Sequence, residues 1–231
     1  QVALLSGQDG YIELHWARFC ASEEFRKNIK LYLDGGAEII PLAVKVPRTP
    51  SPKQQISKFY EELFGRGADA TRALRGAKLI PTEKLGACML RLADMSETDI
   101  MTGISLHWGF QPWLYKNLDQ VDKAKEQTRP SGDYAFRHAG TDEPDQLGKS
   151  YDDAMAEGMT FLNLAEYLLA TAFHKWSLGK WMDAKGWTRT SSLWSDGCLV
   201  GARWGGSRLR VSDGPRAHRS SGNGPRSAEI L

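Results

Sequence analysis

The arginines near the end of the chain are the residues whose type and spacing most clearly suggest chemistry. Residues 197–231 contain six arginines and only two acidic residues, Asp213 and Glu229, which gives the segment a net charge of +4. The same segment has no lysine, seven glycines and five serines. Guanidinium groups recognise carboxylates and phosphates through paired N–H donors. The segment therefore has the composition of a surface that binds an anionic partner.

A period-two pattern indicates how these arginines are positioned. It predicts a hairpin over residues 200–212 with a turn at 205–206, because apolar and polar residues alternate on both sides of the glycines. The inner face comprises Val200, Ala202, Trp204, Leu209 and Val211. The outward and loop positions are the candidate binding residues: Gly201, Arg203, Gly205, Gly206, Arg208, Arg210, Ser212, Arg216, His218, Arg219, Ser220, Ser221 and Asn223.

The sequence contains none of the common catalytic motifs. No GxSxG, HExxH, P-loop or GxGxxG pattern occurs, and the five histidines and three cysteines have no metal-ligand spacing. We interpret Asp152, Asp153 and Glu157 as solvated loop carboxylates rather than as a cation site. We therefore expect no enzymatic activity, no cofactor and no metal. The alternative is an enzyme with an unrecognised site in the first half of the chain.

The element best suited to support the arginine-rich surface is a helix over residues 164–176. Asn163 and Glu166 have the spacing of a capping box at its start. The segment is apolar on nearly all sides, which predicts a buried helix rather than a surface one. Five of the eight tryptophans fall between Trp176 and Trp204, which favours a core built from large rings.

The remaining segments carry weaker signals. In the second half we expect a helix over 113–127, a strand over 133–137 and a long loop over 139–158. In the first half the pattern predicts an edge or broken strand over 38–46 and helices over residues 23–33, 52–64, 68–75 and 82–92. A boundary near residues 101–109 then divides the chain. Residues 1–110 form an α/β region of unknown role, either separate or integral to the fold, and residues 111–231 form the binding domain.

Composition favours a globular protein. Of the 231 residues, 41% are hydrophobic and 25% are charged, which is inconsistent with a disordered or collagen-like chain. No apolar run approaches the roughly 20 residues that a membrane helix needs. Residues 1–9 have neither the basic start nor the apolar core of a signal peptide. We expect no membrane span, and the location stays open between a virion and a cell surface.

Several short motifs in the second half resemble those of one known family. They are Gly186–Thr190, Trp194–Gly197, Val200–Trp204 and Gly224–Arg226. In this order they resemble the C-terminal core of the variable proteins of diversity-generating retroelements, over about residues 131–231. The resemblance implies an α+β chain whose C-terminal half has a C-type lectin fold of the formylglycine-generating-enzyme type, with a buried helix on an antiparallel sheet.

The resemblance also implies a reason for the composition of the tail. In that family a reverse transcriptase randomises the adenines of a template repeat, so that asparagine codons come to encode many residues. Those codons can encode glycine, serine, arginine, histidine and asparagine but not lysine or tryptophan. All the candidate binding residues are of encodable types, which implies a hypervariable region over about residues 198–223.

These observations lead to one functional hypothesis and one alternative. We expect a non-enzymatic ligand-binding protein that recognises a protein with an acidic patch, because five arginines have only Asp213 near them in the sequence. The alternative is a structural or assembly component of a virus particle with a basic packing face. The sequence argues against nucleic acid as the partner, because the tail lacks lysine and an exposed aromatic run. Paired active-site cysteines and a calcium motif are missing, so the resemblance implies neither oxidase activity nor a calcium site.

Overall fold

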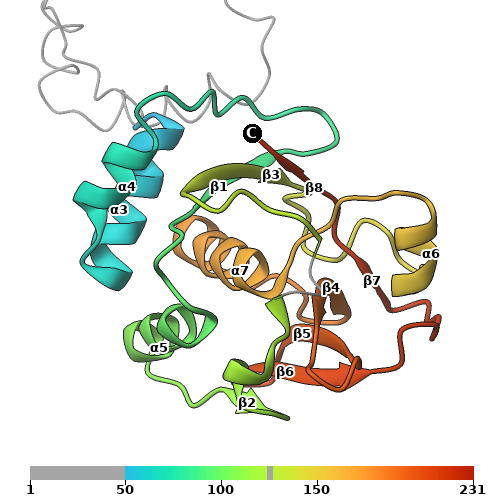
Figure 1. Ribbon diagram of the computed structural model, residues 1–231. Coiled ribbons are helices and arrows are strands. Elements are labelled where there is room, and N and C mark those ends of the chain that lie inside the picture. Colours follow the sequence, from blue (N-terminus) through green and yellow to red (C-terminus); the bar gives the residue numbers. More distant parts are fainter. Residues whose placement is uncertain (1–49, 124–126) are drawn as a thin grey trace, which may run out of the picture. The chain divides into compact units, whose positions relative to one another are not determined.

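Helices and short strands are mixed along the chain in an α+β arrangement (Figure 1). The structure is a computed structural model that describes residues 50–123 and 127–231. The elements predicted over residues 23–33 and 38–46 lie outside the described residues. The described elements are, in order, α3 (Pro52–Phe64), α4 (Gly67–Ala73), β1 (Ala87–Arg91), α5 (Glu97–Trp108), β2 (Trp113–Leu114), η2 (Leu118–Gln120), β3 (Tyr134–His138), α6 (Tyr151–Ala156), α7 (Leu164–Leu178), β4 (Trp187–Leu193), β5 (Leu199–Gly205), β6 (Arg208–Gly214), β7 (Asn223–Pro225) and β8 (Ala228–Ile230).

The strands form two sheets of different size. The larger sheet has the strand order β2-β6-β5-β4-β7, and the smaller has the order β1-β3-β8. Strands β4, β5 and β6 pair antiparallel, whereas the edge strands β2 and β7 pair parallel with their neighbours. The α+β class is thus confirmed. The expected antiparallel sheet is a mixed one, because two short strands from distant parts of the chain join its edges.

Helix α7 lies between the two sheets and is buried along most of its length (Figure 1). It packs against β1 of the smaller sheet and against β4 and β5 of the larger one. The side chain of Asn163 accepts a hydrogen bond from the Glu166 backbone N–H at 2.9 Å, and the Glu166 carboxylate accepts from the Asn163 N–H at 2.8 Å. The predicted cap and the predicted burial of this helix are both confirmed.

Helices α3 and α5 pack against α7, so residues before position 110 share one core with residues after it. The predicted helix over 52–64 is confirmed as α3, which starts at a capping box. Phe59 of α3 meets Phe173 of α7 edge to face, with ring centroids 5.3 Å apart. The indole N–H of Trp176 donates to Glu62 at 2.5 Å. The helix that supports the larger sheet is therefore held by both halves of the chain.

Two further segments differ from the sequence-based expectation. Residues 87–91 form β1 rather than the end of a helix over 82–92, because they pair with β3 in the smaller sheet. Helix α6 interrupts the loop expected over 139–158, and it starts at a capping box made by Ser150 and Asp153. The predicted strand over 133–137 is confirmed as β3.

Residues 113–114 form β2 rather than the start of a helix over 113–127. Trp113 and Leu114 pair with Arg210 and Val211 of β6, and a turn of 3-10 helix, η2, follows them. Residues 113–114 form a strand despite the helical pattern in the sequence, because they pair with β6 of the larger sheet.

A buried ion pair joins the two sheets near the end of the chain. The chain passes from β7 to β8 through Arg226, which is fully buried. Its Nη2 atom lies 2.6 Å from Oδ1 of Asp183, and its Nη1 atom donates to the carbonyl oxygens of Ala139 and Thr141 at 2.8 and 2.9 Å. Asp183 also accepts a hydrogen bond of 2.6 Å from Thr188 of β4. The pair therefore ties β4 to the segment that follows β3.

Removing this pair should cost far more stability than removing an exposed one. We expect Arg226→Met to lower the free energy of unfolding by about 3–5 kcal/mol, because Asp183 would stay buried without its partner. Arg216→Met, which breaks an exposed ion pair with Asp152, should cost no more than about 1 kcal/mol. Urea unfolding measures both. Equal losses in the two variants would contradict the role assigned to Arg226.

A buried histidine in β3 makes the stability depend on pH. His138 is 1% exposed, and its Nδ1 atom lies 3.0 Å from the carbonyl oxygen of Ala139. Burial, with a smaller contribution from the charge of Arg226, lowers the pKa of His138 from 6.5 to about 4. The unfolded chain therefore binds a proton at a higher pH than the folded chain does. Stability is intact above pH 6.5 and falls progressively as the pH drops toward 4.

Replacing the titrating ring should flatten this pH dependence. We expect His138→Gln to lose less stability between pH 6.5 and 4 than the parent does, whatever its stability at pH 7. The measurement is urea unfolding at a series of pH values. A slope that is the same in parent and variant would show that His138 is not the group responsible.

Candidate ligand-binding face

The hairpin of β5 and β6 sorts its side chains as the alternation predicts. Ala202 pairs with Val211, and both residues are fully buried. Arg203 pairs with Arg210 on the opposite face, where Arg210 is exposed and Arg203 half-buried. The hairpin therefore has a core face toward α7 and an outward face that carries the arginines.

An aromatic cluster fixes the end of the core face. The ring of Trp204 stacks on that of Trp181, with centroids 4.1 Å apart and an interplanar angle of 9°. Phe110 meets Trp204 edge to face at 5.2 Å. Because Phe110 precedes β2, the cluster connects the hairpin to the segment that supplies its edge strand.

The strand register aligns one residue from each strand in a row across the outward face. Trp113 of β2 pairs with Arg210 of β6, and Arg210 pairs with Arg203 of β5. Trp187 of β4 is the next residue in the row, because the guanidinium of Arg203 lies 5.4 Å from the centroid of its ring. Trp187 in turn pairs with Asn223 of β7. We call these five residues the central row. It places two guanidinium groups between two indoles, on strands about 4.8 Å apart.

Three arginines of the hairpin carry positive charge that no carboxylate neutralises within the described part of the chain. Arg203, Arg208 and Arg210 form no ion pair there, and the Nε atom of Arg203 is buried without a hydrogen-bond partner. The side chains of Arg203 and Arg210 converge at Gly205, where a Cβ atom would lie 3.1 and 2.9 Å from their Nε atoms. Like charges at paired positions repel, so an anion between them would be stabilising.

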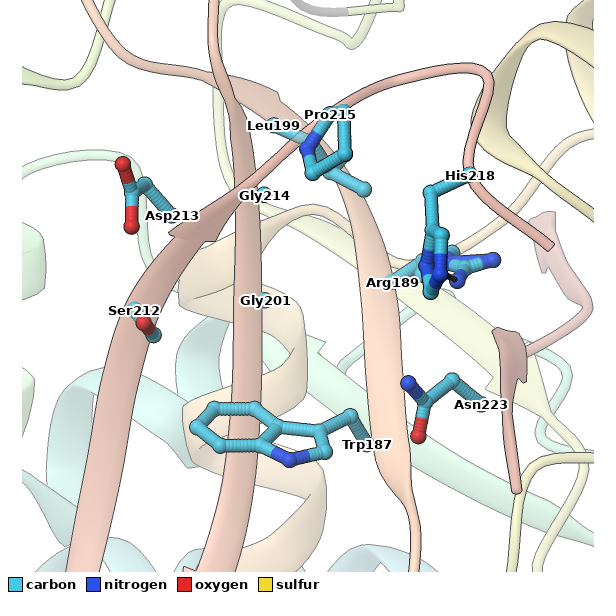
Figure 2. Close-up of a pocket in the computed structure, with 10 residues that line it drawn as sticks. All are labelled: Trp187, Arg189, Leu199, Gly201, Ser212, Asp213, Gly214, Pro215, His218 and Asn223. Carbon is cyan, nitrogen blue, oxygen red and sulfur yellow. Dashed lines mark hydrogen bonds between the residues drawn. The ribbon is translucent and has the colours of Figure 1, made fainter. Parts of the chain in front are cut away.

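A hollow of about 200 Å³ opens beside the central row (Figure 2). Trp187 forms one side, Gly201 lies at its centre, and Arg189 and His218 lie close together on the β4 side (Figure 2). Nη2 of Arg189 is 3.4 Å from Nδ1 of His218, and Nη1 donates to the carbonyl oxygen of Lys149 at 2.7 Å. The complete lining is Trp187, Arg189, Leu199, Gly201, Ser212, Asp213, Gly214, Pro215, His218 and Asn223.

The candidate residues fall into groups on this face. Those that line the hollow are Gly201, Ser212, His218 and Asn223. Those in the segment between β6 and β7 are Arg216, Arg219, Ser220 and Ser221. Gly206 and Arg208 are exposed at the turn, where Gly206 has a φ of 68° that disfavours a side chain. Gly205 departs from the expected outward position, because it is buried next to the side chains of Arg203 and Arg210.

Two arginines expected to face a ligand are paired within the chain. Arg216 forms an ion pair of 2.8 Å with Asp152, and its guanidinium lies 4.9 Å from the ring centroid of Tyr151. Arg219 forms an ion pair of 2.5 Å with Asp153 and holds the pKa of that carboxyl well below its usual range. The expectation of five arginines with one acidic residue nearby is therefore wrong. Asp152 and Asp153 come from α6, more than 60 residues earlier in the sequence.

Sequence reasoning misses three residues of this face: Trp113, Trp187 and Arg189. Trp187 and Arg189 alternate with the buried residues Thr188 and Thr190, a period-two signal that places them on one face of a strand. Trp113 carries no comparable local signal, because β2 has only two residues and pairs with a strand far along the chain.

Comparisons of the chain with protein-family models, curated proteins and solved structures found no significant match. Within residues 50–123 and 127–231, no helix is both long and apolar enough to cross a membrane. Inference about function therefore rests on the residues of the face itself.

The ion pairs of Arg216 and Arg219 should hold the segment 215–222 against α6. We expect the double variant Arg216→Ala, Arg219→Ala to show several-fold faster amide hydrogen exchange in this segment with little change in global stability. The double variant Arg208→Ala, Arg210→Ala is the matched control, because it removes two exposed arginines that form no ion pair with the described residues. Equal exchange in both variants, measured by mass spectrometry, would show that the ion pairs do not order the segment.

Proposed function

We propose that this protein binds ligands without catalysing a reaction, and that its outward face is diversified by a retroelement. The proposal includes a C-type lectin fold for the C-terminal half. Its support is that the family-like motifs coincide with the elements that build the face. Residues 186–190 lead into β4, residues 200–204 lie in β5, and residues 224–226 lead from β7 toward β8.

The observation that carries the proposal is the separation of folding from display in β5 and β6. Val200, Leu209 and Val211 are fully buried, while Arg208 and Arg210 are exposed and make no ion pair within the described residues. Exposed positions of this kind usually change stability by no more than about 0.5 kcal/mol when substituted. A surface built in this way can accept many side chains and keep the same fold.

The residue types of the face support the same proposal. Every candidate position holds a residue that randomised asparagine codons can encode, and residues 197–231 contain no lysine. The indoles of Trp113 and Trp187, which such codons cannot encode, lie outside residues 198–223 and border the variable arginines on both sides. We infer a constant aromatic frame around a variable centre. Gly205 and Gly206 are the positions where the backbone restricts variation most.

The chemistry of the face favours a protein partner with an acidic patch. Arginine and tryptophan are the residue types most enriched among those that dominate binding energy at protein interfaces. Arg203, Arg208 and Arg210 supply positive charge that would steer an acidic partner toward the face. Nucleic acid is the weaker fit, because two of the remaining arginines of the tail are already neutralised by Asp152 and Asp153.

One observation favours the alternative of a structural or assembly component of a virus particle. The edge strand β2 and the residue after it expose Trp113 by 41%, Leu114 by 36% and Tyr115 by 53%. An apolar edge strand can pack against a neighbouring subunit. Under this alternative the arginine-bearing face is an assembly contact, and its residues do not vary between closely related copies of the gene.

The DNA beside the gene tests the proposal most cheaply. We expect a near-copy of the codons for residues 198–223, differing from the gene at adenines, next to a gene for a reverse transcriptase. Sequencing of the locus in the source genome provides the observation. A locus without such a repeat, together with invariant codons 198–223 in closely related isolates, would refute diversification and leave the assembly role.

A further inference from the structure

Arg189 is a buried cation that faces the hollow and forms no ion pair with a carboxylate of residues 50–123 or 127–231. It is 5% exposed, and its guanidinium hydrogen-bonds to the Lys149 carbonyl oxygen and to His218. Buried charges are normally paired, because burial of an uncompensated charge is costly. Arg226 and Arg129 follow this rule, since each holds a carboxylate, from Asp183 and Glu166 respectively. Arg189 therefore differs from these two arginines in its missing carboxylate, which a ligand could supply.

The carboxylates nearest Arg189 are committed elsewhere. Asp153 acts on Arg189 electrostatically, but its oxygens accept hydrogen bonds from Arg219 and from the backbone and hydroxyl of Ser150. Asp213 pairs in register with the buried Val200, so its side chain alternates away from the outward face. Figure 2 shows the Asp213 carboxylate directed away from Arg189. Burial lowers the pKa of Arg189, and the charge of Asp153 opposes this effect.

The other groups around Arg189 suit a small anionic group with an organic stem. His218 and Asn223 bring a ring nitrogen and a side-chain amide to the same side of the hollow, and Trp187 presents its indole ring (Figure 2). Gly201 leaves the centre open because it has no side chain; a Cβ atom there would lie in van der Waals contact with the indole of Trp187, at 3.6 Å. The hollow of about 200 Å³ is several times the volume of roughly 30 Å³ that one water molecule occupies in the liquid.

We propose that the hollow binds a carboxylate of an acidic protein partner, with the guanidinium of Arg189 as its anchor and Trp187 packed against the stem. The identity of the partner as a protein rests on the proposed function; the carboxylate subsite itself does not. Arg189 and Trp187 precede residues 198–223, whereas Gly201, Ser212, His218 and Asn223 lie within that range. If the proposed diversification holds, the subsite is a constant anchor with variable surroundings, and those surroundings select which acidic segment reaches the anchor.

Small carboxylates allow the subsite to be tested without a known partner. The probes are N-acetylglutamate α-amide for a side-chain carboxylate, N-acetylglycine for a chain-end carboxylate, and N-acetylglutamine α-amide as the neutral match of the first. The readout is the indole N–H signal of Trp187 in the ¹⁵N-labelled full chain, assigned with a Trp187→Phe variant. We expect the glutamate probe to shift this signal saturably with a Kd of about 1–10 mM, as befits one charged anchor.

Variants separate the anchor from the remaining positive charge. We expect Arg189→Gln to abolish the shift while the other indole signals and the melting temperature report an intact fold. If Arg189→Gln fails to fold, His218→Ala decides, because His218 is exposed and should weaken binding at least about threefold when removed. Arg75→Ala, which removes an exposed arginine that lies neither in the hollow nor among the candidate binding residues, should leave the Kd unchanged.

The outcomes that would overturn the subsite are specific. They are an equal shift with the neutral probe, an undiminished shift in folded Arg189→Gln or in His218→Ala, or tighter binding of inorganic phosphate than of either carboxylate. A preference for N-acetylglycine over the glutamate probe would overturn the assignment to an acidic side chain. None of these results bears on the template repeat beside the gene, so failure of the subsite and failure of the proposed function can be told apart.

Discussion

The buried contact between Arg226 and Asp183 is the interaction on which both sheets depend. Arg226 stands where the chain leaves the larger sheet and enters the smaller one, and its backbone carbonyl also accepts the N–H of Leu162, just before α7. Asp183 adopts a φ of 54°, which is uncommon for a residue other than glycine. Strain of this kind persists only where the surroundings determine the conformation, and here the guanidinium does so. Through Thr188 of β4 and through Arg226 itself, which directly follows β7, this contact joins the two strands that border the hollow.

Under the proposed function, the face keeps recognition apart from folding. Its centre belongs to β5 and β6, whose inner residues fill the core beside α7, while Arg208 and Arg210 on the outward side are exposed. Its borders come from elsewhere, with Trp113 from β2 on one side and Trp187 from β4 on the other. Large rings contribute contact area at a low entropic cost, which suits the constant borders that we propose around a variable centre.

Local signals explain what the sequence can predict. The start of α7 is encoded by Asn163 and Glu166, and the start of α3 by Ser51 and Gln54, so short-range capping is enough to place both helices. The hairpin follows from strict alternation on both sides of two glycines. The α+β class, in contrast, is implied by the family resemblance rather than by these local signals.

Non-local pairing explains what the sequence cannot predict. Residues 113–114 form strand β2 because they pair with β6 at the edge of the larger sheet. Residues 87–91 form β1 because they pair with β3. The neutralisation of Arg216 and Arg219 depends on α6, whose carboxylates are distant in the sequence. Gly205 belongs to an outward-looking turn in the sequence, yet it is covered by two long side chains that converge only when the strands pair. A sequence shows which side chains are charged, but it does not show which distant side chain of opposite charge each one pairs with.

The central claim is that the outward face can vary while the fold stays the same, and combinatorial display tests it directly. One library randomises Gly201, Arg203, Arg208, Arg210 and Ser212; its matched partner applies the same codons to Val200, Ala202, Leu209 and Val211. Protease resistance of the displayed chains reports folding in each clone. Most clones of the first library should resist protease as the parent does, and nearly all of the second should be cleaved. Comparable cleavage in the two libraries would contradict the claim.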